Sequence, residues 1–159
     1  EFVTPDVMEA RDTWVDRPSG LMFTTPDQGW TRWEAAELAG YADAKLGVRE
    51  GAKCSGYALM RPANGVGARA AADAARAALT FAELVVHVDE DVLYNDKTAR
   101  RYEVVGKRDG VVVAERASYW LDLGNVYGVV VFTSERNYTA LRRCLDRVTA
   151  GFAYGLPSP

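Results

Sequence analysis

The sequence predicts an α+β layered domain in which an antiparallel β meander is backed by helices. The first observation is a run of three segments rich in Val and aromatic residues, at 98–105, 111–121 and 126–133, joined by short hairpin turns. The second is an alanine-rich stretch at 68–79, and the third is an apolar stripe with helical spacing near the C-terminus. The predicted order is therefore strands, a helix, a run of strands and a terminal helix.

Length and composition fit a single domain with a substantial core. The chain has 159 residues, 48% of them hydrophobic, and a formal net charge of −3. A chain of this size buries roughly 70% of its unfolded surface on folding. We expect an extended lead-in over 1–20, one domain over 21–154 and a tail over 155–159. The negative charge argues against nucleic acid as a partner, and no apolar run approaches the ~20 residues that a transmembrane helix needs.

Before the meander, the pattern predicts short strands and one helix. Residues 21–24 favour a strand that ends at the turn Pro26-Asp27-Gln28-Gly29, and 30–34 fit a second strand or the start of a short helix. Residues 36–52 are ambiguous, because helix-forming residues are interrupted by glycines. Residues 54–61 form a strand that Pro62 stops, and 68–79 form a helix because alanine has the highest helix propensity.

The meander is preceded by one more strand and an acidic turn. Residues 83–88 alternate, so the sole histidine, His87, lies on the face opposite three apolar side chains, those of Leu84, Val86 and Val88. The acidic residues of 89–96 form a solvated turn, with a hard cation as the less favoured occupant.

The last hairpin defines two sheet faces. We expect Gly124 and Asn125 to form a two-residue turn, which places Leu121 opposite Gly128 and Tyr119 opposite Val130. That face is apolar and is assigned to the core. The opposite face mixes aromatic, charged and apolar groups, pairing Asp122 with Tyr127, Trp120 with Val129, Ser118 with Val131 and Arg116 with Thr133.

The mixed face is the predicted site for a partner, at Arg116, Trp120, Asp122 and Tyr127. Trp, Tyr and Arg are the usual anchors of binding surfaces, and Arg116 could hold a carboxylate or phosphate in a bidentate way. The alternative is that a second helix layer covers this face.

The chain closes with a helix for which Ser134 is the expected N-cap. Its apolar stripe recurs at spacings of three and four, at Tyr138, Leu141, Leu145, Val148 and Phe152. Four arginines lie mostly off that stripe, at 136, 142, 143 and 147. They form a solvated face, with an acidic partner or anionic lipid headgroups as the alternative.

The two cysteines, Cys54 and Cys144, are expected to form a disulfide, with two free thiols as the alternative. The chain begins Glu1-Phe2 rather than with Met, which suggests a processed chain. We therefore expect a secreted or cell-envelope protein, with a possible lipid anchor upstream of Glu1.

No strong catalytic motif is present, and we expect neither a cofactor nor a metal. The segment Gly65-Val66-Gly67-Ala68-Arg69-Ala70 fits the G-x-G-x-x-G/A pattern that holds a pyrophosphate at a helix N-terminus. A nucleotide- or dinucleotide-binding enzyme using this loop is the alternative function. It is less favoured, because Pro62-Ala63-Asn64 separates the glycines from the strand and an antiparallel meander follows.

This layout resembles the PsbP-like family. The matching features are the aromatic segment from Phe23 to Trp30, the strand ending at Arg61-Pro62, the meander and the final amphipathic helix. The most family-like stretch runs from Ala117-Ser118-Tyr119-Trp120 to Phe132. The resemblance implies an α/β/α sandwich and a non-enzymatic module that binds a protein or small-molecule partner. It carries over no functional residue.

Overall fold

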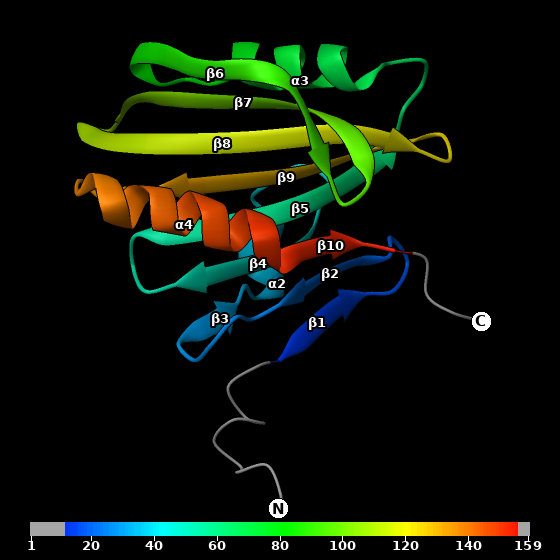
Figure 1. The fold of residues 1–159 in the computed structure, drawn as a ribbon, viewed down its shortest axis with the longest axis horizontal. Coiled ribbons are helices and arrows are strands. Elements are labelled where there is room, and N and C mark those ends of the chain that lie inside the picture. The colour runs from blue at the N-terminus through cyan, green and yellow to red at the C-terminus, as the bar shows by residue number, and fades with distance from the viewer. Residues whose placement is uncertain (1–11, 156–159) are drawn as a thin grey trace, which may run out of the picture.

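The computed structural model describes residues 12–155, and Figure 1 shows the order of their elements. The main sheet has seven strands, every neighbouring pair of which is antiparallel. Its order across the sheet is β3 (Trp30–Arg32), β4 (Ala44–Glu50), β5 (Cys54–Pro62), β9 (Asn125–Thr133), β8 (Val111–Asp122), β7 (Lys97–Arg108) and β6 (Ala82–Tyr94). The predicted meander is therefore confirmed as strands β7, β8 and β9.

A smaller, three-stranded sheet is built from the two ends of the described chain. It contains β1 (Thr13–Asp16), β2 (Leu21–Thr24) and β10 (Phe152–Tyr154), in the order β1-β2-β10. Strand β1 lies within the segment expected as a lead-in. Residues 1–11 of the expected lead-in and 156–159 of the expected tail lie outside the described residues.

Three helices complete the described fold: α2 (Ala35–Leu38), α3 (Ala68–Ala77) and α4 (Tyr138–Gly151). Helix α3 packs on β7 and β8, whereas α4 packs on β9, β5 and β8. The two helices use opposite faces of the sheet, as the alternation of β8 shows: Ala117 and Tyr119 pack with α3, and Trp120 packs with α4. The domain is thus the α+β sandwich that the sequence and the family resemblance predict.

Each face of the main sheet has its own core. Under α4, the buried cluster includes Trp120, Val131, Leu145 and Val148 and continues into the small sheet through Phe23. Helix α4 lies close to β5 because Gly56 has no side chain: a Cβ there would be 2.6 Å from Cγ1 of Val148. The second core lies under α3 and includes Ala71, Ala72 and Tyr102.

The hairpin register differs from the predicted one by two residues. The turn is formed by Leu123 and Gly124, both with positive φ (49° and 79°), so Tyr119 pairs with Gly128 and Trp120 with Tyr127. A shift of two leaves every side chain on its predicted face. The predicted pairings were wrong, but the division into two faces was right.

Local corrections concern the ends of elements. Asn137, not Ser134, caps α4, because its side-chain Oδ1 accepts a hydrogen bond from the amide of Ala140 at 3.1 Å. Tyr138 is 72% exposed and lies outside the buried stripe, and Phe152 belongs to β10 rather than to the helix. The ambiguous stretch 36–52 forms the end of α2 and the strand β4.

The edge strand β6 also differs from its prediction. It runs through the acidic residues to Tyr94, and the positive-φ turn that follows is at Asn95 and Asp96. Irregular pairing between Ala82 and Val85 and between Val86 and Val88 breaks the expected alternation.

Cys54 and Cys144 form a disulfide with a Cα–Cα distance of 5.8 Å, as predicted. It joins the first residue of β5 to the middle of α4. The cross-link therefore fastens the α4 layer to the sheet.

Candidate functional site

The predicted partner site lies under helix α4 rather than on an open surface. Three of its four side chains are buried, with Trp120, Tyr127 and Arg116 exposed by only 1%, 3% and 6%. Trp120 stacks on Tyr127, and Tyr154 of β10 packs against both rings. The prediction of an accessible face is wrong for these three residues, because α4 and β10 cover the sheet there. Asp122, at the sheet end, accepts a hydrogen bond from Tyr154 at 2.8 Å.

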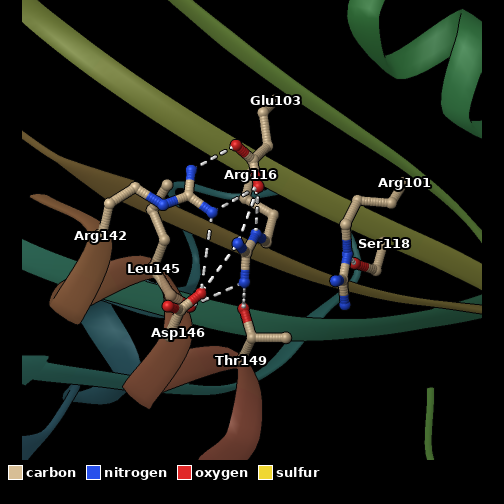
Figure 2. A network of polar contacts seen from close by, with 8 residues as sticks. All are labelled: Arg101, Glu103, Arg116, Ser118, Arg142, Leu145, Asp146 and Thr149. Atoms are coloured by element: carbon tan, nitrogen blue, oxygen red, sulfur yellow. Dashed lines mark hydrogen bonds and ion pairs between the residues drawn. The ribbon is translucent and has the colours of Figure 1, made fainter. Parts of the chain in front are cut away.

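Arg116 instead forms the centre of a buried ion-pair network (Figure 2). Its guanidinium contacts Glu103 at 2.7 Å and Asp146 at 2.9 Å, and Arg142 contacts the other oxygen of Glu103 at 2.6 Å. Burial alone raises the pKa of Glu103, but Arg142 and Arg116 outweigh it and hold that pKa below its ordinary value. With both cations engaged, the network ties α4 to β7 and β8.

The arginines expected on the solvated face of α4 divide into two groups. Arg142 belongs to the network, and Arg147 pairs with Asp27 and Glu50 while its guanidinium lies 5.5 Å from the ring centroid of Trp30. Arg136 and Arg143 are exposed, as predicted. Half of the predicted basic face therefore holds neighbouring elements in place.

The Gly65–Ala70 loop does not occupy a dinucleotide site. The fingerprint needs the carboxyl end of a strand in a parallel sheet, whereas every strand pair of the described sheets is antiparallel. Gly67 is simply the N-cap residue of α3. The nucleotide-enzyme alternative is thus unsupported.

The acidic stretch forms ion pairs across β6, β7 and α3, and His87 lines a hollow between the sheet and α4. Asp89 pairs with Arg76 of α3 at 2.8 Å and with Arg100 at 2.9 Å, and Arg100 also pairs with Asp91 at 3.2 Å. Among residues 12–155, no group of three or more His, Cys, Asp or Glu side chains could hold a metal ion. No helix of this region is long and apolar enough to span a membrane.

The strongest candidate site is a cavity of about 450 Å³ under the C-terminal end of α3. Its floor is the α3 face of the sheet, its roof is α3 with the residues that follow it, and its side wall is the loop after α2. The side chains that give it its character are Tyr41, Tyr57, Tyr102, Glu115, Tyr119 and Phe132. We call it the tyrosine cavity.

The strands position these side chains by simple alternation. Glu115 and Tyr119 of β8 lie on the same face, and Tyr102 of β7 follows on the next strand. The Tyr119 ring lies over Gly128 of β9, where a Cβ would be 2.7 Å from its Cε2 atom. The absence of a side chain at Gly128 therefore leaves room for the Tyr119 ring on the floor of the cavity.

Glu115 is the one acidic side chain of the tyrosine cavity. It is 4% exposed, and its Oε2 accepts a hydrogen bond from the Tyr102 hydroxyl at 2.9 Å. It makes no ion pair with any residue from 12 to 155. Burial raises its pKa, and the Tyr102 hydrogen bond and the charge of Arg108 only partly oppose this.

The phenols supply neutral polar groups and ring surface. Burial raises the pKa of Tyr119 to about 12 and that of Tyr57 further, so both hydroxyls stay protonated. Within residues 12–155, the only fully buried side-chain polar atom without a partner is Nε1 of Trp120, under α4. The hydroxyls of Tyr41 and Tyr57 make no hydrogen bond to a described residue and are not fully buried, so they are free to bind a ligand.

Sequence reasoning missed this site, although one signal for it was present. In the alternating strand 111–121, Glu115 shares a face with Val113, Ala117 and Tyr119, which is the face assigned to the core. A carboxyl group at a core position is the kind of exception that marks a site. Tyr41 and Tyr57 gave no such signal, because they meet Phe132 only through the folding of separate segments.

Comparison with known proteins identifies the fold. No protein-family model and no curated protein matches the sequence. The structure is similar to cyanobacterial PsbP (CyanoP) from Synechocystis sp. PCC 6803, with 12% identity, a TM-score of 0.64 and coverage of 92% of this chain and 93% of that one. It is also similar to LpqN of Mycobacterium tuberculosis, described as involved in cell envelope biogenesis, with 9% identity, a TM-score of 0.63 and 93% of both chains covered.

A third similar structure is a protein of unknown function from Pseudomonas aeruginosa, described as a putative regulator. It shares 13% identity and a TM-score of 0.51 over 94% of this chain and 98% of that one. At such identities the similarity concerns the fold, and it extends over nearly the whole of each protein. The chain therefore has a PsbP-like fold, as its sequence layout predicts.

Proposed function

We propose that this protein is a non-enzymatic binding module that works outside the cytoplasm and holds a small ligand in the tyrosine cavity. The observation that carries the proposal is the cavity's composition: buried polar groups around about 450 Å³ of space, with phenol hydroxyls unused by the protein. Binding sites for small molecules are typically preformed hollows of this size with a few convergent polar groups.

The absence of a catalytic arrangement in the cavity favours binding over catalysis. Its lining contains no histidine, cysteine or lysine, and its one carboxyl group is hydrogen-bonded to a phenol whose own pKa is raised. A nucleophile would need an adjacent base. The described residues around this hollow pair no such groups.

An extracytoplasmic location is supported by the disulfide and by one of the similar structures. Disulfides persist in oxidising compartments and are rare in the cytosol. LpqN, which shares the fold, is described as involved in cell envelope biogenesis. A secreted or lipid-anchored form remains part of this proposal.

Ligand-observed NMR with a neutral probe, 3,3-dimethylbutan-1-ol, tests the cavity. We expect saturation transfer to the probe from the wild-type protein and its loss in Ala75→Leu, which places a larger side chain in the roof. Ala74→Leu is the matched control, because Ala74 is on the same helix but is exposed and does not line the cavity. Equal signals from both variants would show that the probe binds elsewhere and would contradict the proposal.

Thiol alkylation in intact cells of the native host tests the location. A permeant maleimide added before lysis should leave Cys54 and Cys144 unlabelled, and reduction after denaturation should expose both to a second label. Mass spectrometry reads the two labels separately. Complete labelling by the first reagent would indicate a reducing compartment and would refute the extracytoplasmic part of the proposal.

A further inference from the structure

We infer that the ligand of the tyrosine cavity is a small organic cation, whose ammonium or quaternary ammonium group lies between Glu115 and the rings of Tyr41, Tyr57 and Phe132. This inference rests on the proposed function, since it names the ligand class of the same cavity. Three features of the cavity point to such a ligand: the unpaired carboxyl group, the surrounding rings and the single arginine at the mouth.

Glu115 is a buried carboxyl group that has no positively charged partner among the described residues. It is 4% exposed, and only one of its oxygens is hydrogen-bonded, to the neutral hydroxyl of Tyr102. A carboxylate taken out of water is costly unless it is paired with a positive charge. Because the described residues provide no such pair, a ligand cation is the partner that would stabilise the ionised form.

The rings next to Glu115 suit the same kind of ligand. Tyr41, Tyr57 and Phe132 are half-buried, and their centroids lie 4.8 to 6.5 Å from one another. Aromatic faces attract cations, and clustered rings are a recurring means of binding quaternary ammonium groups. A neutral ligand would gain the ring contacts but would leave Glu115 unpaired.

The charge of Arg108, at the mouth of the cavity, allows cationic and anionic ligands to be distinguished. It is exposed at the mouth, its guanidinium lies 4.7 Å from the ring centroid of Phe81, and it makes no ion pair with Glu115. Its positive charge opposes a cationic ligand and favours an anionic one. Removing that charge should therefore strengthen the binding of a cation.

The pH dependence of binding follows from the same groups. The titratable or charged side chains that line the cavity around Glu115 are those of Tyr41, Tyr57, Tyr102, Tyr119 and Arg108. Burial raises the pKa values of Tyr57, Tyr102 and Tyr119. The lining residues of α3 and of the segment after it carry no charge. Glu115 is thus the only group of the cavity whose ionisation changes in mildly acidic solution, and affinity for a cation should rise with pH as it loses its proton.

Isothermal titration with choline and with 3,3-dimethylbutan-1-ol, its neutral carbon analogue, tests the inference. We expect choline to bind at least tenfold more tightly at pH 7. Glu115→Gln keeps an acceptor for the Tyr102 hydroxyl but removes the charge, so it should lose most of this preference. Glu90→Gln, at an exposed acid on β6, is the matched control and should change nothing.

Two further measurements keep the test independent of how well Glu115→Gln folds. In the wild-type protein, choline affinity should fall several-fold between pH 7 and pH 4.5, while affinity for the neutral analogue stays constant. Arg108→Gln should strengthen choline binding about two- to fivefold. A flat pH profile, or weaker choline binding by Arg108→Gln, would overturn the cation assignment.

The outcomes separate this inference from the proposed function. If the neutral analogue binds and choline does so no better, the cavity is a binding site but its ligand is not a cation. If neither probe binds to the wild-type protein, the cavity proposal and the cation inference both fail. Tighter binding of choline that Glu115→Gln abolishes supports both.

Discussion

Glu103 and Glu115 are two buried carboxyl groups on neighbouring strands, and the sheet separates them. Glu103 is 8% exposed under α4 and is held by Arg116 and Arg142, whereas Glu115 is 4% exposed on the α3 face and has only a phenol as donor. Their pKa values consequently move in opposite directions, down for Glu103 and up for Glu115. Two carboxyl groups with similar burial thus have different roles. Glu103, which is paired, joins elements of the fold, whereas Glu115, which is unpaired, is the group that we propose pairs with a ligand.

The disulfide reinforces this asymmetry, because it fastens only the α4 side to the sheet. Replacing both cysteines by alanine should lower the free energy of unfolding by about 4–5 kcal/mol, since the bond closes a loop of about 90 residues in the unfolded chain. Urea unfolding of both proteins without reductant measures the difference. A loss below about 1 kcal/mol would mean that the link contributes little to holding α4.

The ion-pair network supplies the next largest effect. Arg116→Ala removes the cation that Glu103 and Asp146 share, and breaking a buried pair is costly. Because Glu103 keeps Arg142 and the Asp146 side chain is 60% exposed, we expect the lower end of the usual range, about 3 kcal/mol. Denaturant melts at pH 7 provide the value. The control is Arg136→Ala, an exposed position for which we expect less than about 0.5 kcal/mol. Similar losses in the two variants would remove the distinction between network and surface arginines.

Apolar packing under α4 should show the same contrast along one helix. Leu145 is 1% exposed, so Leu145→Ala should cost about 2–5 kcal/mol, the usual range for a truncated core side chain. Tyr138 and Arg143 are exposed, so their alanine variants should each cost less than about 0.5 kcal/mol. Chemical denaturation of the three variants decides whether the buried stripe begins after Tyr138.

The smallest effect, and the most direct comparison of the two carboxyl groups, is in the pH dependence of stability. Glu103 has a lowered pKa in the folded state, so its stabilisation is present above the unfolded pKa and is lost as pH falls through the folded value. Glu115 has a raised pKa, so its contribution is complete below the unfolded pKa and is lost as pH rises through the folded value.

Urea melts from pH 4 to pH 7 should therefore separate the two variants. Glu103→Gln should be destabilised most at pH 7 and least at pH 4. Glu115→Gln should be at least as stable as the wild type at pH 7, and any gain should shrink towards pH 4. Destabilisation of Glu115→Gln that grows with pH would indicate that a protein cation pairs with this group after all.

The fold class could be predicted from the sequence because the patterns that indicate it each lie within a single segment. The alanine run of α3, the meander and the stripe of α4 can each be read within one segment, and the even register error left the side chains on the correct faces. The cysteine pairing was also correct. What failed locally were the caps and turns, as at Asn137 and Leu123, where neighbouring polar residues and glycines compete for the same role.

The binding site could not be predicted in the same way, because it depends on which face is covered. Arg116 and Trp120 have the composition of a binding surface, but α4 and β10, far away in sequence, close over them. The tyrosine cavity depends on the alanines that α3 and the residue after it turn towards the sheet, and on Tyr41, which comes from a segment with no clear pattern. Only Glu115, an acid at a core position, pointed to it from sequence.

The bond between Cys54 and Cys144 also closes a covalent ring that contains α3, strands β5 to β9 and the first half of α4. A single proteolytic cut within this ring, for example at the exposed turn Asp109-Gly110, leaves the protein one covalent molecule. A cut between Tyr41 and Cys54 has no such protection, because it breaks the covalent link between the ring and the segment that carries Tyr41. In surroundings rich in proteases, the floor of the cavity is therefore covalently retained after one cut, whereas its side wall can be lost.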